Sequence, residues 1–137
     1  MQRELHPLGW AWFDVVTDRI AASFDRGRLS GVFGVPRGGL IPAVALSHRL
    51  DLPLLMEPND SMLWVDDIID SGQTLKYWRA KYPSATYSAL IGPYPGGAYC
   101  GDYITRSLWY VFPWEDLDRA ADDMAEYMAK AKGVANE

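Results

Sequence analysis

Short apolar runs alternate with segments of helical periodicity along this chain, and the alternation constrains its fold most strongly. Five apolar runs predict strands: they occupy residues 31–35, 53–56, 62–65, 85–91 and 108–112. Other segments place apolar side chains every three or four positions, which predicts helices. They cover residues 9–26, 40–50, 75–82 and 117–128. Such alternation is typical of a parallel sheet covered on both faces. We expect an α/β fold, a mostly parallel five-stranded sheet flanked by helices, in a single domain (residues 1–137).

Composition and charge narrow the classes of protein. With 137 residues, 49% of them hydrophobic, the chain can bury a sizeable core. Its net charge of −5 argues against a nucleic-acid partner, because neutralising phosphates requires clustered Lys and Arg. A single cysteine, Cys100, excludes a disulfide within the chain and favours a reducing compartment. No run of about 18 apolar residues occurs, so we expect a cytoplasmic protein without a membrane partner.

The richest chemistry directly follows the third apolar run. Asp66 and Asp67 come first, then Asp70, and a helix opens through Ser71, Gly72, Gln73 and Thr74. Backbone N–H groups at a helix start, together with Ser and Thr hydroxyls, form a nest for a phosphate. Two adjacent acids can accept hydrogen bonds from sugar hydroxyls or hold Mg²⁺ through water, and Asp70 can accept a proton beside the nest. Alternatively, Asp70 and Ser71 cap the helix and the acids are solvated.

Residues 62–74 also resemble the signature with which type I phosphoribosyltransferases bind phosphoribosyl pyrophosphate (PRPP), although Gln73 replaces a usual Gly or Ala. The resemblance implies that Asp66 and Asp67 bind the ribose hydroxyls of PRPP, and we expect them to be the Mg²⁺ ligands through water. It implies that residues 70–74 wrap the 5′-phosphate. Asp70 is implied to lie near N7 of a purine as the proton acceptor, which makes it the expected catalytic residue.

The loop after the first apolar run supports the same family. Residues 33–42 resemble the Ser-Arg-Gly-Gly-Leu-x-Pro loop of the xanthine/guanine phosphoribosyltransferases. Arg37 offers a fixed fork of donors, and Gly38 and Gly39 expose backbone N–H groups before a helix. By itself the loop fits a tight turn with a surface Arg equally well. The resemblance implies that Arg37, Gly38 and Gly39 bind pyrophosphate, with unusual peptide geometry where Pro36 replaces Ser.

A third segment, residues 109–115, resembles the late Trp-x-x-x-Pro-Trp-Asp/Glu segment of the family. The resemblance implies that Trp109 stacks on the base and that Tyr110, next in the chain, offers backbone groups to the base edge. In a segment this apolar, Trp109 also fits a core position. Glu115 and Asp116 are expected to favour the start of the last helix electrostatically.

Two features of the family are missing. Residues 56–62 replace a long excursion that includes a closing loop, and residues 90–94 contain no Lys at the place where 6-oxopurine enzymes bind the 6-oxo group. We expect a Mg²⁺-dependent phosphoribosyltransferase that joins a purine-like nitrogenous base to PRPP and releases pyrophosphate. The alternative is a catalytically impaired relative that binds nucleotides or acts as a regulatory protein. The expected partners are small molecules, and a homo-oligomer is considered because members of the family commonly self-associate.

Overall fold

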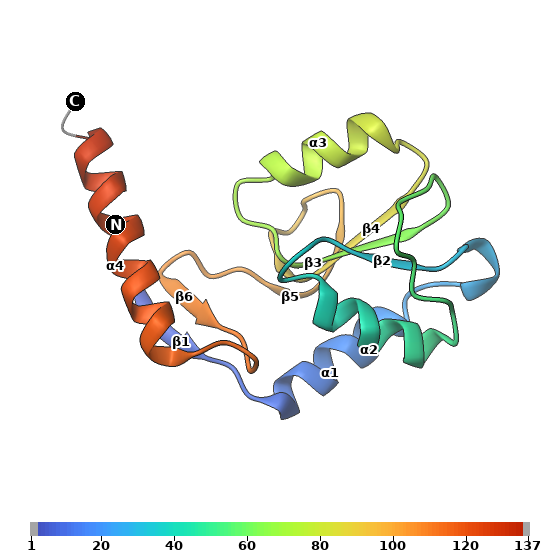
Figure 1. Ribbon diagram of the computed structural model, residues 1–137, viewed down its shortest axis with the longest axis horizontal. Helices are drawn as coiled ribbons and strands as arrows, with labels where there is room; N and C mark the ends of the chain where they lie inside the picture. Colours follow the sequence, from blue (N-terminus) through green and yellow to red (C-terminus); the bar gives the residue numbers. More distant parts are fainter. Residues whose placement is uncertain (1–2, 136–137) are drawn as a thin grey trace. The chain divides into compact units, whose positions relative to one another are not determined.

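The computed structural model describes residues 3–135, and the chain divides into two compact units (Figure 1). One unit is Asp14–Ile104. The other, called the terminal unit here, combines Met1–Phe13 with Thr105–Glu137. Helix α1 (Trp10–Ala21) begins in the terminal unit and ends in the larger one. Whether the two units form a single domain, as expected, stays a prediction.

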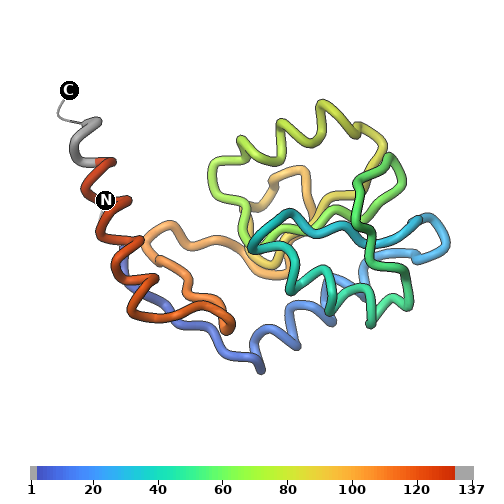
Figure 2. Tube along the Cα trace, viewed as in Figure 1, coloured from blue at the N-terminus to red at the C-terminus, as the bar shows by residue number. Residues whose placement is uncertain are grey.

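A four-stranded parallel sheet forms the centre of the larger unit. Its strands follow the order β2 (Val32–Gly34), β3 (Leu63–Ile68), β4 (Thr86–Gly92) and β5 (Tyr99–Tyr103). Helix α2 (Leu40–Leu50) leads toward β3, and α3 (Gln73–Lys81) links β3 to β4, as the chain trace shows (Figure 2). A short 3-10 helix, η1 (Arg26–Arg28), precedes β2. In Figure 1, α3 covers one face of the sheet and α2 the other, which confirms the α/β fold with parallel strands flanked by helices.

The core explains why the central strands read as continuous apolar runs. Leu63, Trp64 and Val65 of β3 are fully buried, because both faces of this sheet are covered. On the α3 side, the ring of Trp78 lies 5.4 Å from Phe33 and 6.3 Å from Trp64, measured between centroids. This aromatic packing anchors β3 and α3, the two elements that carry the acidic loop between them.

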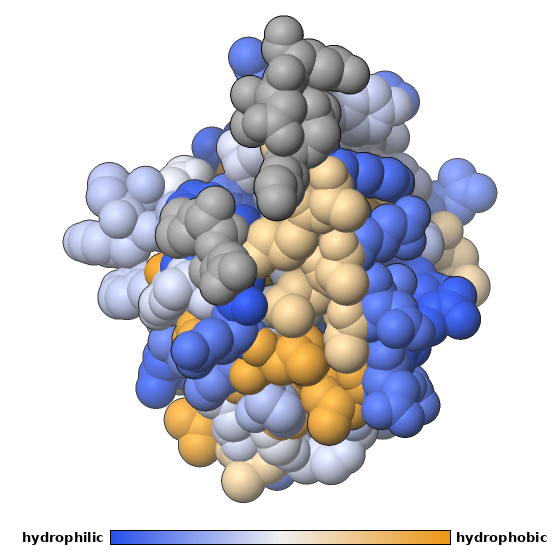
Figure 3. Space-filling model, turned by 90° about the vertical axis from the view of Figure 1, so that its left-hand side faces the viewer, coloured by the Kyte–Doolittle hydropathy of each residue, from blue (hydrophilic) through white to orange (hydrophobic). Residues whose placement is uncertain are grey.

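The terminal unit contains a second, two-stranded parallel sheet. Strand β1 (Glu4–Pro7) pairs with β6 (Leu108–Val111), and α4 (Leu117–Ala135) follows. Asp116 Oδ1 accepts from the Arg119 N–H at 2.8 Å, so Asp116 caps the start of α4. Figure 3 shows the face that carries this helix, where an apolar strip runs between hydrophilic flanks.

The expected five-stranded sheet is therefore wrong in its details. Residues 53–56 form one isolated bridge, from Leu54 to Val32, because Pro53 has no N–H to donate to a ladder. The last expected strand pairs with β1 and not with the larger sheet. Strand β5 was not foreseen, because Gly101 and Asp102 interrupt its apolar pattern.

Candidate active site at the carboxyl ends of the strands

The loop after β3 surrounds a hollow of about 170 Å³. The lining residues come from the end of β3, the loop and the first turn of α3. They are Asp66, Ile68, Ile69, Asp70, Ser71, Gly72, Thr74 and Leu75. The structure thus brings together five of the seven residues predicted for the ribose and the 5′-phosphate. Gln73 and Asp67 are not part of this lining.

Backbone conformation shapes the phosphate loop. Gly72 has a φ of 82°, in the left-handed region that favours glycine, whereas a Cβ there would meet nothing within 4 Å. Glycine is therefore needed for its conformation and not for space. The Gln73 N–H donates to Ser71 Oγ at 3.3 Å, whereas the N-cap residue of α3 is Gly72 and makes no capping hydrogen bond with a side chain. A hydroxyl that accepts one hydrogen bond can still donate its own hydrogen to a ligand, so this bond is compatible with phosphate binding.

The acid pair at the end of β3 is half-buried. Asp66 Oδ1 accepts from the Asp67 N–H at 2.8 Å, and Asp67 Oδ1 accepts from the Ile68 N–H at 2.7 Å. Burial, followed by the hydrogen bond and the like charge of Asp67, raises the pKa of Asp66 to about 8. A protonated Asp66 can both donate and accept hydrogen bonds, and an ionised Asp66 can accept them from a sugar hydroxyl.

The Arg-Gly-Gly loop meets this acid pair. The Val35 N–H donates to the Val65 carbonyl at 2.9 Å, which ties the loop to β3. The peptide bond between Pro36 and Arg37 is cis, the kind of unusual geometry expected there. A Cβ at Gly38 would overlap the Asp67 carboxylate, so only glycine allows the two loops to approach this closely. Two of the three predicted motifs therefore lie side by side.

The two residues predicted for the base lie in the terminal unit. The Trp109 ring lies 5.3 Å from that of Tyr127 on α4, and the Arg3 guanidinium lies 5.8 Å from the Trp109 ring centre. The Tyr110 hydroxyl accepts from the Thr105 N–H at 2.8 Å. Trp109 is half-buried and not fully in the core, and its contact with a base stays a prediction.

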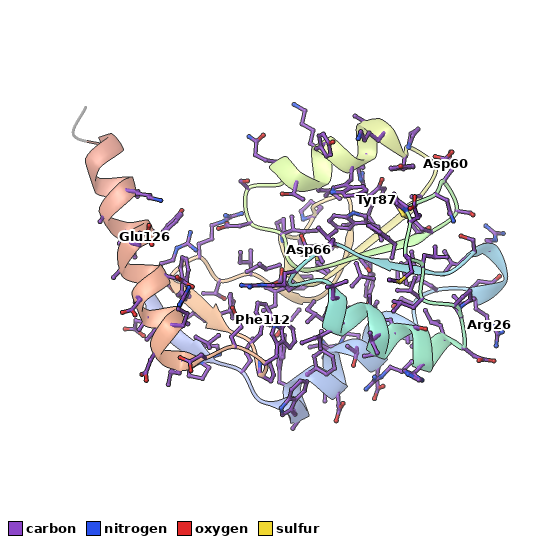
Figure 4. The ribbon with its side chains drawn as sticks, in the orientation of Figure 1. Arg26, Asp60, Asp66, Tyr87, Phe112 and Glu126 are labelled. Atoms are coloured by element: carbon purple, nitrogen blue, oxygen red, sulfur yellow. The ribbon has the colours of Figure 1, made fainter. Side chains whose placement is uncertain are left out.

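The segment that stands in place of the closing loop lies at the other edge of the sheet. Asn59 Oδ1 accepts from Ser30 Oγ at 2.8 Å, from the Ser61 N–H at 3.0 Å and from Ser61 Oγ at 3.2 Å. Ser30 comes just before β2 and Ser61 just before β3, so this turn is tied to the amino ends of the strands. In Figure 4, Asp60 of this turn and Asp66 lie at opposite ends of the sheet. Residues 57–61 therefore cannot cover the hollow.

One part of the carboxyl edge escaped the sequence interpretation. Strand β5 ends at Tyr103, opposite Gly92 in the ladder, and the ring of Tyr103 lies 5.0 Å from that of Tyr94. The sequence signal for β5 was a period-two pattern that places Tyr99, Gly101 and Tyr103 on one face of the strand. Gly101 has no side chain and so interrupts this pattern.

Acids, a helix start and an Arg-Gly-Gly loop at the carboxyl edge of a parallel sheet are typical of α/β proteins that bind phosphorylated ligands. No family model matches the chain. The xanthine-guanine phosphoribosyltransferase of Cereibacter sphaeroides (strain ATCC 17025 / ATH 2.4.3) is 30% identical over 120 residues, which cover 66% of this chain and 72% of that protein. This chain belongs to the type I phosphoribosyltransferase family, which confirms the predicted family and class of enzyme.

Solved structures agree with this assignment. The purine phosphoribosyltransferase from Pyrococcus horikoshii Ot3 has a TM-score of 0.67 and 27% identity, over 83% of this chain and 95% of that one. The xanthine-guanine-hypoxanthine phosphoribosyltransferase of Helicobacter pylori has a TM-score of 0.62 over 88% of this chain and 99% of that one. At 19% identity, this second likeness supports the fold alone.

No helix in the described part of the chain is both long and apolar enough to cross a bilayer.

Proposed function

We propose that this protein transfers the 5-phosphoribosyl group of PRPP to a ring nitrogen of a purine-like base. The bond between the anomeric carbon and the pyrophosphate oxygen breaks, and pyrophosphate leaves with the electron pair. A bond forms between the same carbon and the base nitrogen, which loses its proton. The observation that carries this proposal is the hollow at the start of α3, in which Asp66, Asp70 and Thr74 converge in a member of this family.

The 5′-phosphate end of PRPP determines how the substrate is positioned in the site. Backbone N–H groups in the first turn of α3 and the hydroxyls of Ser71 and Thr74 hold the 5′-phosphate, with Gln73, the first residue of that helix, beside them. Asp66 and Asp67 bind the ribose hydroxyls. Asp70 lines the same hollow, where it accepts the proton that the base nitrogen releases.

The pyrophosphate end is held by the neighbouring loop. Arg37 provides paired donors, and Gly38 and Gly39 provide close backbone approach beside the Asp67 carboxylate. Among residues 3–135 no group of three or more metal-ligating side chains occurs. The Asp66–Asp67 pair fits Mg²⁺ that takes its remaining ligands from water and substrate phosphates. When bound, Mg²⁺ would neutralise charge on the pyrophosphate leaving group.

We further propose that Trp109 stacks on the base and that the backbone of Tyr110 meets the base edge. The lone buried cysteine supports a cytoplasmic location. We also propose that the protein forms a homo-oligomer, for which no interface is assigned. Membership of the phosphoribosyltransferase family favours the enzyme over the nucleotide-binding alternative.

The test mixes the protein with Mg²⁺, PRPP and single bases: xanthine, guanine, hypoxanthine, adenine and orotate. Nucleotide formation and pyrophosphate release are measured together, with a no-base control for hydrolysis of PRPP. We expect a nucleotide from at least one purine, with slow transfer and measurable hydrolysis because residues 57–61 cannot exclude water. No nucleotide from any base, with a melting temperature that still rises in guanosine monophosphate, would instead support the binding alternative.

A further inference from the structure

Two tyrosines at the carboxyl edge of the larger unit are exposed together. The side chain of Tyr94 follows β4 and is 75% exposed, and that of Tyr103 ends β5 and is 58% exposed. Their ring centroids lie 5.0 Å apart with an angle of 41° between the planes. Isolated exposed aromatic residues are ordinary on a protein surface, but a pair at the ligand edge of a parallel sheet offers two aromatic rings to a ligand.

Hydrogen bonds connect this pair to the phosphate hollow. Ile69, which lines the hollow, donates its N–H to the Ile91 carbonyl at 2.9 Å. The next residue, Gly92, is opposite Tyr103 in the ladder, and its carbonyl accepts from the Ile104 N–H at 2.9 Å. Strand β4, which Tyr94 follows, is one spacing from β3, and β5, which ends at Tyr103, is two spacings or about 10 Å from β3. Spacings of this order lie within the length of a nucleoside monophosphate, measured from its phosphate to the far edge of its base.

The link between β4 and β5 carries Tyr94 and contacts α3. Residues 93–98 connect two parallel neighbours without a helix, and Gly97 adopts a left-handed φ of 77°. A Cβ at Gly97 would lie 2.9 Å from Arg79 Nη1, so the link packs against α3. Arg79 in turn lies 5.1 Å from the ring centre of Tyr87 in β4. Gly97 therefore lies against the Arg79 side chain, and Tyr94 stands three positions earlier in the same link.

We propose that Tyr94 and Tyr103 bind the planar base of the substrate, an inference that rests on the proposed phosphoribosyl transfer. Phenol rings stack on heterocycles, and their neutral hydroxyls both donate and accept hydrogen bonds. No Lys or Arg occurs between Gly92 and Tyr103. The two tyrosines therefore recognise a base by stacking and by hydrogen bonds of their hydroxyls.

The experiment separates the base from the phosphate. Guanosine monophosphate and ribose 5-phosphate are titrated into the wild type, Tyr94→Ala, Tyr103→Ala and Tyr77→Ala. Tyr77 is a matched control, because it is 57% exposed, has an aromatic neighbour and lies on α3. We expect each edge variant to weaken binding of the nucleotide about tenfold. The edge variants should leave the binding of ribose 5-phosphate unchanged. Tyr77→Ala should alter the binding of neither ligand. Tyr94→Phe shows whether the ring alone suffices.

The outcomes distinguish this inference from the proposed function. Turnover of PRPP by the wild type, with unchanged nucleotide affinity in both edge variants, overturns the tyrosine assignment alone. Equal weakening of nucleotide and ribose 5-phosphate binding also overturns it, since the loss then does not concern the base. A wild type that binds neither ligand overturns the proposed function as well. Thermal unfolding of each variant confirms that the fold is intact.

Discussion

The two edges of the four-stranded sheet use polar residues in opposite ways. At the amino edge, Asn59 accepts three hydrogen bonds from Ser30 and Ser61, so these groups satisfy one another. At the carboxyl edge, Asp66 and Asp70 line a hollow, and burial beside Asp67 raises the pKa of Asp66 to about 8. A cluster of polar residues therefore does not by itself identify a ligand-binding site. The direction in which a strand runs decides which loops can serve a ligand.

The largest effect that would test this contrast between the two sheet edges is expected on the rate of nucleotide formation. Asp70→Asn removes the proposed proton acceptor and should lower kcat about 100-fold, with an unchanged melting temperature. The matched control is Asp60→Asn, an exposed acid at the amino edge, which should leave kcat unchanged. Steady-state rates of nucleotide formation from PRPP and a purine measure both. If the two variants lost activity equally, the distinction between the edges would not hold.

A smaller effect is expected on the binding of phosphate. Thr74→Ala removes one hydroxyl that lines the hollow, and the loss of a hydrogen bond to a charged group costs about 1.5–3 kcal/mol. Isothermal titration with a nucleoside monophosphate should show this loss. Ser84→Ala, at the exposed turn before β4, is the control. Wild-type affinity in Thr74→Ala would remove Thr74 from the phosphate site.

Close packing beneath the carboxyl edge can be tested by stability. A Cβ at Gly92 would overlap Cys100 Sγ, so Gly92→Ala should lower the free energy of unfolding by about 1–3 kcal/mol. Adding Cys100→Ala removes the sulfur and leaves contacts of 3.4 Å or more, so the double variant should recover part of the loss. Urea denaturation of both single variants and the double variant measures the coupling. Strictly additive losses would mean that the clash does not occur.

Local chemistry explains what the sequence could predict. The run from Leu63 to Val65 is apolar because both faces of β3 are buried, and the acids, glycine and hydroxyls after it mark a loop and a helix start. These features depend on neighbours in the chain. The strand and most of the site lining were therefore predictable from residues 62–74 alone.

The remaining features depend on contacts between distant residues. Strand β6 pairs with β1, about a hundred positions away, and no local pattern encodes that choice. Strand β5 was missed because Gly101 interrupts its pattern. The contact between Gly38 and Asp67 and the raised pKa of Asp66 arise from burial, which only the assembled sheet provides.

The smallest expected effect concerns the amino edge itself. Asn59→Ala removes an acceptor shared by Ser30 and Ser61, in a turn that is largely exposed to solvent. Water replaces much of what is lost, so the free energy of unfolding should fall by only about 1 kcal/mol, with kcat and KM unchanged. Urea denaturation and steady-state kinetics on the same preparation measure the two quantities. If Asn59→Ala instead lowered kcat tenfold at unchanged stability, residues 57–61 would take part in catalysis, and the division of labour between the two edges would be wrong.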